Sequence, residues 1–256
     1  MKKIVITNQK GGVGKSTTAL NLGFGLINKG FKVLFIDLDQ QGNLSFSLNA
    51  DPQNYNLLEL LTDNNKDIKD FIQHYDRFDV ISSHPALAAA DLKITEIGKE
   101  YRLKEILSSI EKDYDFCIID TPPSLGVLNI NAMVVGDYAI VPCGVDFYSV
   151  QGLYFLADNI DSVKRYCKSQ LKVLGLLLTR YKGHTNISKD LLPIFADTAA
   201  RFNSKVFGVK IRDNVDIAVA NSKQSDIFSF NSRCNGSLDY MALTDEVLKE
   251  IDKNEQ

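Results

Sequence analysis

Cysteine, histidine and proline are scarce in this sequence. Its 256 residues include four cysteines, three histidines and six prolines. The cysteines are widely spaced and form no Cys-x-x-Cys pair, which argues against a disulfide framework and against a cysteine-based metal centre. The histidines show no spacing typical of metal ligands. Six prolines and sixteen glycines are also too few for a low-complexity linker.

Long hydrophobic stretches are missing as well. A membrane-spanning helix needs about 20 apolar residues, whereas the first apolar run ends at Asn8, Gln9 and Lys10. We therefore expect neither a transmembrane segment nor a secretory signal peptide. Free thiols in a chain without a signal peptide favour a reducing compartment, so we expect a cytoplasmic protein.

The charges are distributed unevenly along the chain. The composition is ordinary for a globular protein, with 45% hydrophobic and 24% charged residues and a net charge of −3. Residues 160–212, however, carry eleven Lys or Arg against three Asp, an excess of eight positive charges, so the remainder carries an excess of eleven negative charges. Such asymmetry indicates either an anionic partner or a set of solvated helix faces, and both interpretations stay open.

Short apolar runs alternate with longer helical patterns from one end of the chain to the other. The predicted strands are Lys3–Thr7, Lys32–Asp37, Phe78–Ser82, Phe116–Asp120, Tyr138–Pro142, Val173–Thr179 and Val206–Ile211. The predicted helices are Lys15–Asn28, Tyr101–Ile110, Leu125–Val135, Val150–Tyr166, Ser188–Phe202 and Ser237–Ile251. Strands that are apolar on both faces are typical of a parallel sheet covered by helices. The pattern therefore predicts a single α/β domain over residues 1–256, a doubly wound and mostly parallel twisted sheet with helices on both faces.

The segment 43–76 is more polar and less regular than the rest of the chain. We expect it to form short helices, with Asn56 capping a helix over Leu57–Leu61.

The strongest functional signal is a glycine-rich loop between the first predicted strand and the first predicted helix. It reads Asn8-Gln9-Lys10-Gly11-Gly12-Val13-Gly14-Lys15-Ser16-Thr17. Glycines let backbone N–H groups approach an anion, and the start of a helix adds its positive dipole end. In a phosphate loop of this kind Lys15 contacts the outer phosphates of a nucleotide and the Ser16 hydroxyl binds Mg²⁺.

The loop departs from the usual pattern in two ways. Gln9 stands where the strict pattern has glycine, and Lys10 adds a second lysine to the loop. One triphosphate rarely needs two lysines from one loop. Lys10 is therefore either an exposed surface residue without a binding role or a contact to the phosphates of a second subunit.

Aspartates follow two of the other predicted strands. Asp37 and Asp39 follow one strand, and Asp120 ends another. The carboxyl ends of parallel strands lie at the same edge of a sheet, so these side chains are expected beside the phosphate loop. The predicted metal-binding set is therefore Ser16, Asp37, Asp39 and Asp120.

Three motifs together resemble the ParA/MinD family of ATPases, which have a deviant phosphate loop. They are Lys10–Thr17, then Val33–Asn43, in which Gln40 replaces the usual proline, and then Asp115–Ser124. The similarity covers essentially the whole chain and implies a deviant P-loop NTPase fold, with ATP and Mg²⁺ as cofactors and slow, partner-stimulated hydrolysis.

The resemblance also implies roles for individual residues. Lys10, Lys15 and Asp39 would be catalytic, Asp39 by orienting the attacking water, while Asp37 supports the metal side and Asp120 binds Mg²⁺ directly or through water. The nucleotide-binding residues would be Lys10, Gly11, Gly12, Val13, Gly14, Lys15, Ser16, Thr17 and, around the adenine, Thr179, Arg180, Ile211, Arg212 and Asn214.

The family resemblance implies a switch that partitions plasmid or chromosome DNA. Such a protein forms a homodimer with Mg-ATP, binds nonspecific DNA on the nucleoid and responds to a ParB-type centromere-binding protein. Here Asp213 and Asp216 replace arginines of the family, one of which is associated with DNA binding, so we expect DNA elsewhere on the basic segment. The candidate DNA-binding residues are Lys164, Arg165, Lys168, Arg201, Lys205 and Lys210.

Other functions of similar loops are alternatives. A MinD-like membrane switch, or another cargo-positioning ATPase that does not act on DNA, would keep the ATPase and change the surface. The acidic C-terminal helix argues against the membrane version, because residues 237–256 hold six Asp or Glu against two Lys. An iron–sulfur reductase would need suitably placed cysteines, which Cys117 and Cys143 do not provide, and no residue pattern indicates an amide ligase. A nucleotide-dependent scaffold without turnover also stays open.

Overall fold

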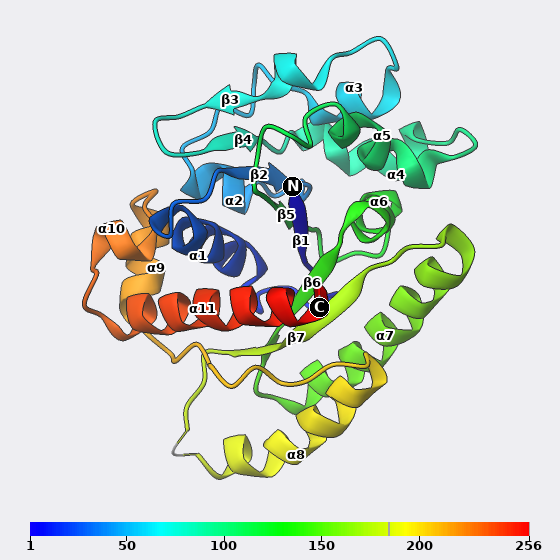
Figure 1. Ribbon diagram of the computed structural model, residues 1–256. Coiled ribbons are helices and arrows are strands. Elements are labelled where there is room, and N and C mark those ends of the chain that lie inside the picture. The colour runs from blue at the N-terminus through cyan, green and yellow to red at the C-terminus, as the bar shows by residue number, and fades with distance from the viewer. Residues whose placement is uncertain (184, 256) are drawn as a thin grey trace.

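A seven-stranded sheet forms the centre of the computed structural model, which describes residues 1–183 and 185–255 (Figure 1). The strands are β1 (Lys2–Ile6), β2 (Val33–Asp37), β3 (Gln73–His74), β4 (Asp79–Ile81), β5 (Phe116–Asp120), β6 (Tyr138–Gly144) and β7 (Lys172–Thr179). Their order is β3-β4-β2-β5-β1-β6-β7. Only β3 is antiparallel to its neighbour β4, and the other paired strands are parallel. The predicted mostly parallel sheet is confirmed.

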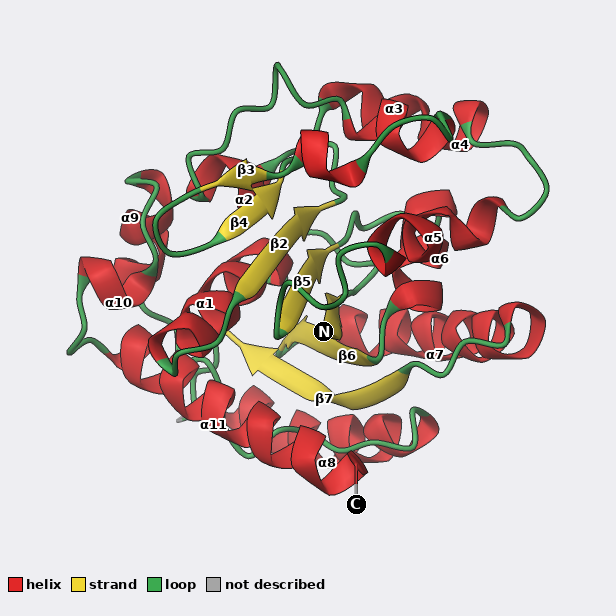
Figure 2. Ribbon diagram, turned by 45° about the horizontal axis from the view of Figure 1, so that its top comes forward, coloured by secondary structure: helices red, strands yellow, loops and turns green. Residues whose placement is uncertain are grey.

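Helices cover both faces of this sheet (Figure 2). They are α1 (Lys15–Asn28), α2 (Asn43–Ser47), α3 (Leu57–Thr62), α4 (Ala90–Lys93), α5 (Arg102–Ser108), α6 (Val127–Val135), α7 (Phe147–Cys167), α8 (Asn186–Arg201), α9 (Val215–Ser222), α10 (Ile227–Phe230) and α11 (Asn235–Glu255). Helices α1, α2 and α9 to α11 pack on one face, and α3 to α8 pack on the other. The doubly wound arrangement is therefore confirmed, and α1 has its predicted bounds.

The alternation of side chains along the central strands explains why both faces need a cover. In β2, Phe35 faces the α1 and α11 layer, whereas Leu34 and Ile36 face the α5 and α6 layer, and all three side chains are fully buried. A strand that is apolar on both sides can be stable only between two helical layers. The short helix α3 also begins as expected, because the Asn56 side chain accepts a hydrogen bond from the Leu58 N–H at 3.2 Å.

The prediction of a strand over Val206–Ile211 is wrong. The segment runs beside β7 and forms an isolated bridge with it at Leu176 and Val206, and a second isolated bridge joins Tyr181 to Arg212 just beyond both segments. The reason lies in the competing acceptor Glu246 of α11. Its carboxylate takes the N–H groups of Gly208 and Val209, both at 3.0 Å, so these groups cannot join a sheet ladder. The seventh strand is instead the two-residue β3, which was not predicted.

Among residues 1–183 and 185–255, none of the helices combines the length and the apolar character that crossing a bilayer requires.

Candidate nucleotide-binding and catalytic site

The phosphate loop connects β1 to α1 and is held from several sides. Gly12 and Gly14 have φ angles of 70° and 89°, a left-handed conformation that residues with a side chain rarely adopt. The Asn8 amide donates to the Pro142 carbonyl at 2.7 Å, and the Thr179 hydroxyl donates to the Val13 carbonyl at 2.8 Å. These contacts fix the loop backbone so that its N–H groups can surround an anion.

Lys15 is the cation inside the loop. It is only 7% exposed, and its ammonium group makes one long hydrogen bond, 3.5 Å from Nζ to the Lys10 carbonyl. Burial lowers the pKa of Lys15, while the nearby carboxylates of Asp120 and Asp39 oppose that effect. An ammonium group has three donors, so Lys15 keeps donors available for phosphate oxygens.

Asp37 and Asp120 lie side by side at the ends of β2 and β5. The two residues are partners in the parallel register of these strands. Asp37 is fully buried and accepts from the N–H of Ser45 at 2.8 Å, the hydroxyl of Ser45 at 2.7 Å and the N–H of Asp39 at 3.0 Å. Burial raises the pKa of Asp37 to about 6, although these hydrogen bonds oppose the rise. Asp37 thus fixes the loop that carries Asp39.

Asp120 has a different environment. It is fully buried, and neither carboxylate oxygen has a hydrogen-bond partner of normal geometry among the described residues. Burial and the neighbouring Asp37 raise the pKa of Asp120 well above its ordinary value, and the Ser16 hydroxyl and Lys15 oppose them. A buried carboxylate without partners needs a cation or bound water, so this side chain fits the Mg²⁺ that a phosphate loop binds.

The protein itself would supply few direct ligands to that ion. Within 1–183 and 185–255 there is no group of three or more His, Cys, Asp or Glu residues that could hold a metal. Mg²⁺ usually keeps several waters and binds through one or two protein groups plus the phosphates of a nucleotide. Ser16 and Asp120 fit this pattern, with Asp37 behind them.

Asp39 lies at the edge of the phosphate site. It is 6% exposed, and one of its carboxylate oxygens accepts the N–H of Gln41 at 3.0 Å. The Ser83 hydroxyl donates to the Asp39 backbone carbonyl, which anchors Asp39 to the segment that follows β4. Asp39 lines the cavity above the phosphate loop, so a carboxylate oxygen is available to a water molecule in that cavity.

Two cavities meet at the phosphate loop. One, of about 530 Å³, is lined by Lys15, Ser16 and Asp39. The other, of about 250 Å³, is lined by all five residues predicted around the adenine, Thr179, Arg180, Ile211, Arg212 and Asn214. Gly12, Gly14, Thr17 and Asn221 line both. The arrangement fits a nucleotide with its phosphates in the first cavity and its base in the second.

Several residues of the base cavity also hold its walls in place. The Arg212 guanidinium forms a bidentate pair with Asp239 of α11, with N–O distances from 2.6 to 3.1 Å. Asn214 caps α9 by accepting the N–H of Asp216 at 2.7 Å. Arg180 donates to the Gly12 carbonyl. The base cavity is therefore built by joining α9, α11 and the phosphate loop.

Lys10 does not point into its own nucleotide site. It lines neither cavity, and its Nζ lies 2.7 and 2.8 Å from the two carboxylate oxygens of Asp146 and 3.1 Å from the Ser149 hydroxyl. Asp146 also caps α7 by accepting the N–H of Ser149 at 2.9 Å. The ion pair is only partly buried, so it can open.

Sequence reasoning missed three residues of the site. Asn221 joins α9 to the phosphate loop, because its amide donates to the Thr17 hydroxyl at 3.1 Å. Asp146 and Asp239 hold Lys10 and Arg212. Only Asp146 carried a signal, and only for its capping role, since aspartate is a preferred residue directly before a helix.

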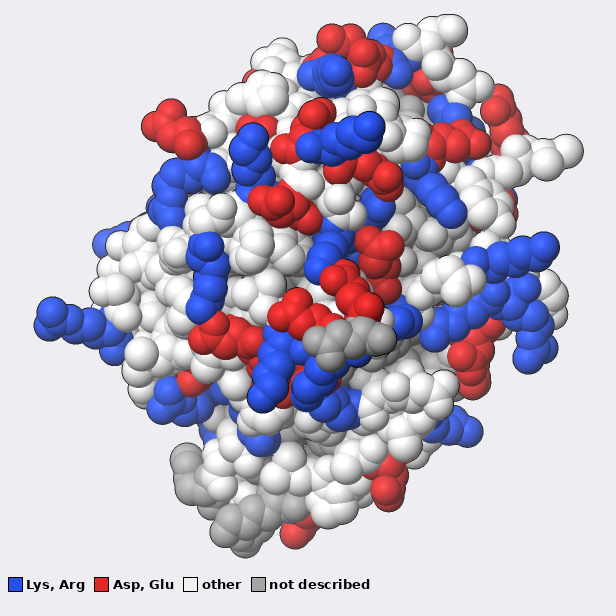
Figure 3. All heavy atoms as spheres, viewed as in Figure 1, with Lys and Arg blue, Asp and Glu red and all other residues white. Residues whose placement is uncertain are grey.

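The six predicted DNA-binding residues come from several segments of the chain. Lys164, Arg165 and Lys168 lie at the end of α7, where Figure 3 shows a group of basic side chains at the right-hand edge. Arg201 lies over the ring of Tyr154 at 4.7 Å. Lys205 pairs with Glu246 and Glu250. Lys210 lies farther along the chain, 5.6 Å from the centre of the Tyr181 ring.

Comparison with known proteins agrees with this geometry. Residues 1–173 match the family model described as an AAA domain. The chain is 35% identical to the sporulation initiation inhibitor protein Soj of Bacillus subtilis, covering 96% of this chain and 98% of Soj. A structure of cobyrinic acid a,c-diamide synthase from Mycobacterium smegmatis, with a bound ATP analogue and magnesium, superposes with a TM-score of 0.84 at 29% identity, covering 99% of this chain and 97% of that one. A plasmid partition protein from Borrelia burgdorferi gives a TM-score of 0.71 at 30% identity, covering 89% and 98%.

The chain belongs to the ParA/MinD family of ATPases. It is an ATPase with the family's cofactors, ATP and Mg²⁺. These relatives include both a synthase and a partition protein, so the similarity alone does not identify the cargo.

Proposed function

We propose that the chain is an ATP-dependent switch that partitions DNA, acting as one ATPase domain over residues 1–256. It dimerises with Mg-ATP, binds DNA without sequence specificity, and hydrolyses ATP when a ParB-type centromere-binding protein stimulates it. Its place in the cell would then be the nucleoid within the cytoplasm. The cargo would be a plasmid or a chromosome.

The observation that carries this proposal is the separation of the two loop lysines. Lys15 lines the phosphate cavity and suffices for the loop's own phosphates, whereas Lys10 lies outside both cavities, against Asp146. A lysine side chain that lies outside its own nucleotide cavity can bind the phosphates held by a second copy of the chain. Two chains would then each complete the other's site, which makes dimerisation depend on bound ATP.

Within each site, the residues have separate tasks. Lys15 and the loop N–H groups bind the phosphates, and Ser16 and Asp120 would hold Mg²⁺, which neutralises phosphate charge during transfer. Asp39 would orient the attacking water from the cavity edge, and Asp37 keeps Asp39 in place through its hydrogen bonds to the loop. Because phosphoryl transfer depends mainly on positioning and charge, these residues are sufficient for slow hydrolysis.

Support for DNA as the cargo comes from the uneven charge. Residues 160–212 carry eleven Lys or Arg against three Asp, although the net charge of the chain is −3. Asp213 and Asp216 carry negative charge, which repels DNA phosphates, and Asp213 also pairs with Lys182 at 3.0 Å. We therefore expect DNA to bind at a distance from this loop, at basic residues elsewhere in the segment.

The test is DNA binding in defined nucleotide states. Wild-type protein with a slowly hydrolysed ATP analogue should dimerise and retard a random-sequence duplex, and with ADP it should do neither. Asp39→Ala should bind DNA persistently with ATP itself, because turnover is slow, while Lys15→Ala should bind neither ATP nor DNA. If the ATP-loaded wild-type dimer ignores DNA, the switch positions a different cargo.

A further inference from the structure

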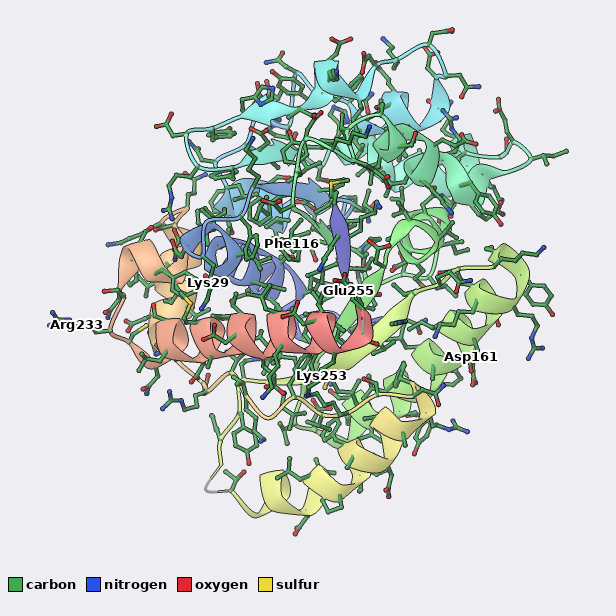
Figure 4. The ribbon with its side chains drawn as sticks, viewed as in Figure 1. Lys29, Phe116, Asp161, Arg233, Lys253 and Glu255 are labelled. Atoms are coloured by element: carbon green, nitrogen blue, oxygen red, sulfur yellow. The ribbon has the colours of Figure 1, made fainter. Side chains whose placement is uncertain are left out.

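A separate polar pocket lies at the end of β7 opposite to the nucleotide site. Its volume is about 370 Å³, and its lining includes Lys164, Lys172, Ser204, Lys205, Glu250 and Asn254. Figure 4 labels Asp161 and Lys253 on α7 and α11, the two helices that border it. Thr179 at the other end of β7 touches the phosphate loop. Lys172 and Thr179 are seven residue steps apart, which corresponds to about 23 Å along a strand, so the pocket is separate from the nucleotide site.

The charges lining this pocket are not balanced. Lys205 lies 3.0 Å from Glu246 and 3.1 Å from Glu250, and Lys253 lies 2.8 Å from Glu250. These two carboxylates are thus matched by two ammonium groups. Lys164 has no ion pair within residues 1–183 and 185–255, and Lys172 contacts only the Asn254 carbonyl, at 3.3 Å. Two positive charges therefore remain without a counter-charge.

A hydroxyl group in the same lining also lacks a partner. The Ser204 oxygen is buried and makes no hydrogen bond to any described residue. An unsatisfied buried hydroxyl is costly, and a small rotation would let it donate to an oxygen in the pocket. Two unpaired lysines and a free hydroxyl donor are complementary to one tetrahedral oxyanion.

We propose that this pocket binds a backbone phosphate of double-stranded DNA; the inference rests on the proposed function and adds Lys172 to its binding residues. DNA is favoured over a small free anion because the positive surface continues past the pocket. Arg165 and Lys168 lie at the same end of α7 as Lys164. A duplex presents a phosphate about every 3.4 Å along each strand, so it can contact the pocket and this helix end together.

The proposal gives Glu250 an opposing role. Its carboxylate lines the pocket and repels an incoming phosphate, while it also restrains Lys205. Removing this negative charge should strengthen DNA binding, whereas removing Lys164 and Lys172 should weaken it. Loss of fold cannot produce these opposite responses.

The experiment measures DNA affinity against salt concentration for the full chain loaded with an ATP analogue. The probe is a random-sequence duplex. Lys164→Ala/Lys172→Ala should lower affinity by about 30-fold at 0.15 M salt and reduce the log–log salt slope by about one, because the one phosphate contact that is lost removes roughly 0.9 from the slope. Glu250→Gln should bind the same duplex severalfold more tightly. Inorganic phosphate at millimolar concentration should compete only weakly.

A matched control removes two lysines elsewhere. Lys93→Ala/Lys112→Ala changes the net charge equally at two exposed positions outside the pocket, and it should leave affinity within about fivefold of wild type. The inference is overturned if wild type binds DNA and the Lys164/Lys172 variant matches this control. It is also overturned if Glu250→Gln fails to tighten binding or if millimolar phosphate displaces DNA. Absence of DNA binding by wild type would instead refute the proposed function.

Discussion

Replacing Asp146 by asparagine should strengthen ATP-dependent dimerisation. In the single chain the Asp146 carboxylate holds Lys10 through contacts of 2.7 and 2.8 Å, and in the proposed dimer Lys10 would leave it to reach a second copy. Asparagine has nearly the same size and caps a helix equally well, so the start of α7 is preserved. The substitution removes only the charge that retains Lys10.

The size of the effect follows from the exposure of the pair. The side chains of Lys10 and Asp146 are 35% and 44% exposed, and ion pairs this close to solvent are worth at most about 1 kcal/mol. Each dimer breaks two such pairs, so the gain is at most about 2 kcal/mol, which corresponds to an approximately 30-fold lower dimer Kd. High salt should reduce the difference, because it screens the wild-type pair.

Sedimentation velocity over a protein concentration series, with a slowly hydrolysed ATP analogue, measures this Kd. Asp161→Asn, which removes an exposed carboxylate from the same helix, is the matched control and should behave like wild type. Lys10→Ala should bind one nucleotide per chain and remain monomeric. An unchanged or weaker dimer for Asp146→Asn, with normal nucleotide binding, would refute the idea that Asp146 retains Lys10.

Four further substitutions test other parts of the structure. Lys15→Ala should greatly weaken Mg-ATP binding in calorimetric titration, because it removes the buried cation of the loop; unchanged affinity in a folded variant would contradict the site. Gly175→Ala should lower the free energy of unfolding in urea by about 1–3 kcal/mol, since its Cβ would lie 2.6 Å from the Phe207 ring. Gly152→Ala should instead stabilise α7 by about 0.5–1 kcal/mol, because its Cβ would have nothing within 4 Å. Burial raises the pKa of Glu246, but the N–H groups of residues 208 and 209 and the ammonium group of residue 205 outweigh it, so the pKa lies below its ordinary value. The stability that the ionised Glu246 carboxylate contributes is present above its unfolded-state pKa and disappears as the pH falls through its folded-state pKa. Glu246→Gln should therefore lower the free energy of unfolding by about 1–2 kcal/mol at pH 7 and leave it unchanged in strong acid. An equal loss at both pH values would contradict this assignment.

The sequence was sufficient for those elements whose local pattern and tertiary setting agree. Helix α1 has its predicted bounds because the glycine loop fixes its start and Gly30, with a φ of 92°, ends it. The central strands were recognisable because they are apolar on both faces. The pattern in Val206–Ile211 looked the same, yet Glu246, some forty residues away in the sequence, takes the N–H groups that a strand would need. No local pattern contains that information.

The residues of the site also differ in whether a local sequence pattern marks them. Residues that belong to continuous motifs, such as Lys15, Asp39 and Asp120, were predictable because nucleotide chemistry restricts both their type and their spacing. Asn221 and Asp239 were not predictable, because each acts through a partner on a distant segment and neither stands in a motif. The partner of Lys10 was beyond prediction for the same reason, since Asp146 lies 136 residues away.

The failed strand has a consequence for how two copies can meet. Residues 205–211 cover the outer side of β7, where the N–H groups of Phe207 and Ile211 donate to the carbonyls of Leu176 and Leu178. The opposite border of the sheet ends in β3, which is only two residues long and antiparallel. Neither border offers a long row of free backbone groups to another chain, so edge-to-edge growth into fibres is disfavoured. In the proposed switch, association would then depend on side chains around the nucleotide, where contacts can be released when the nucleotide changes.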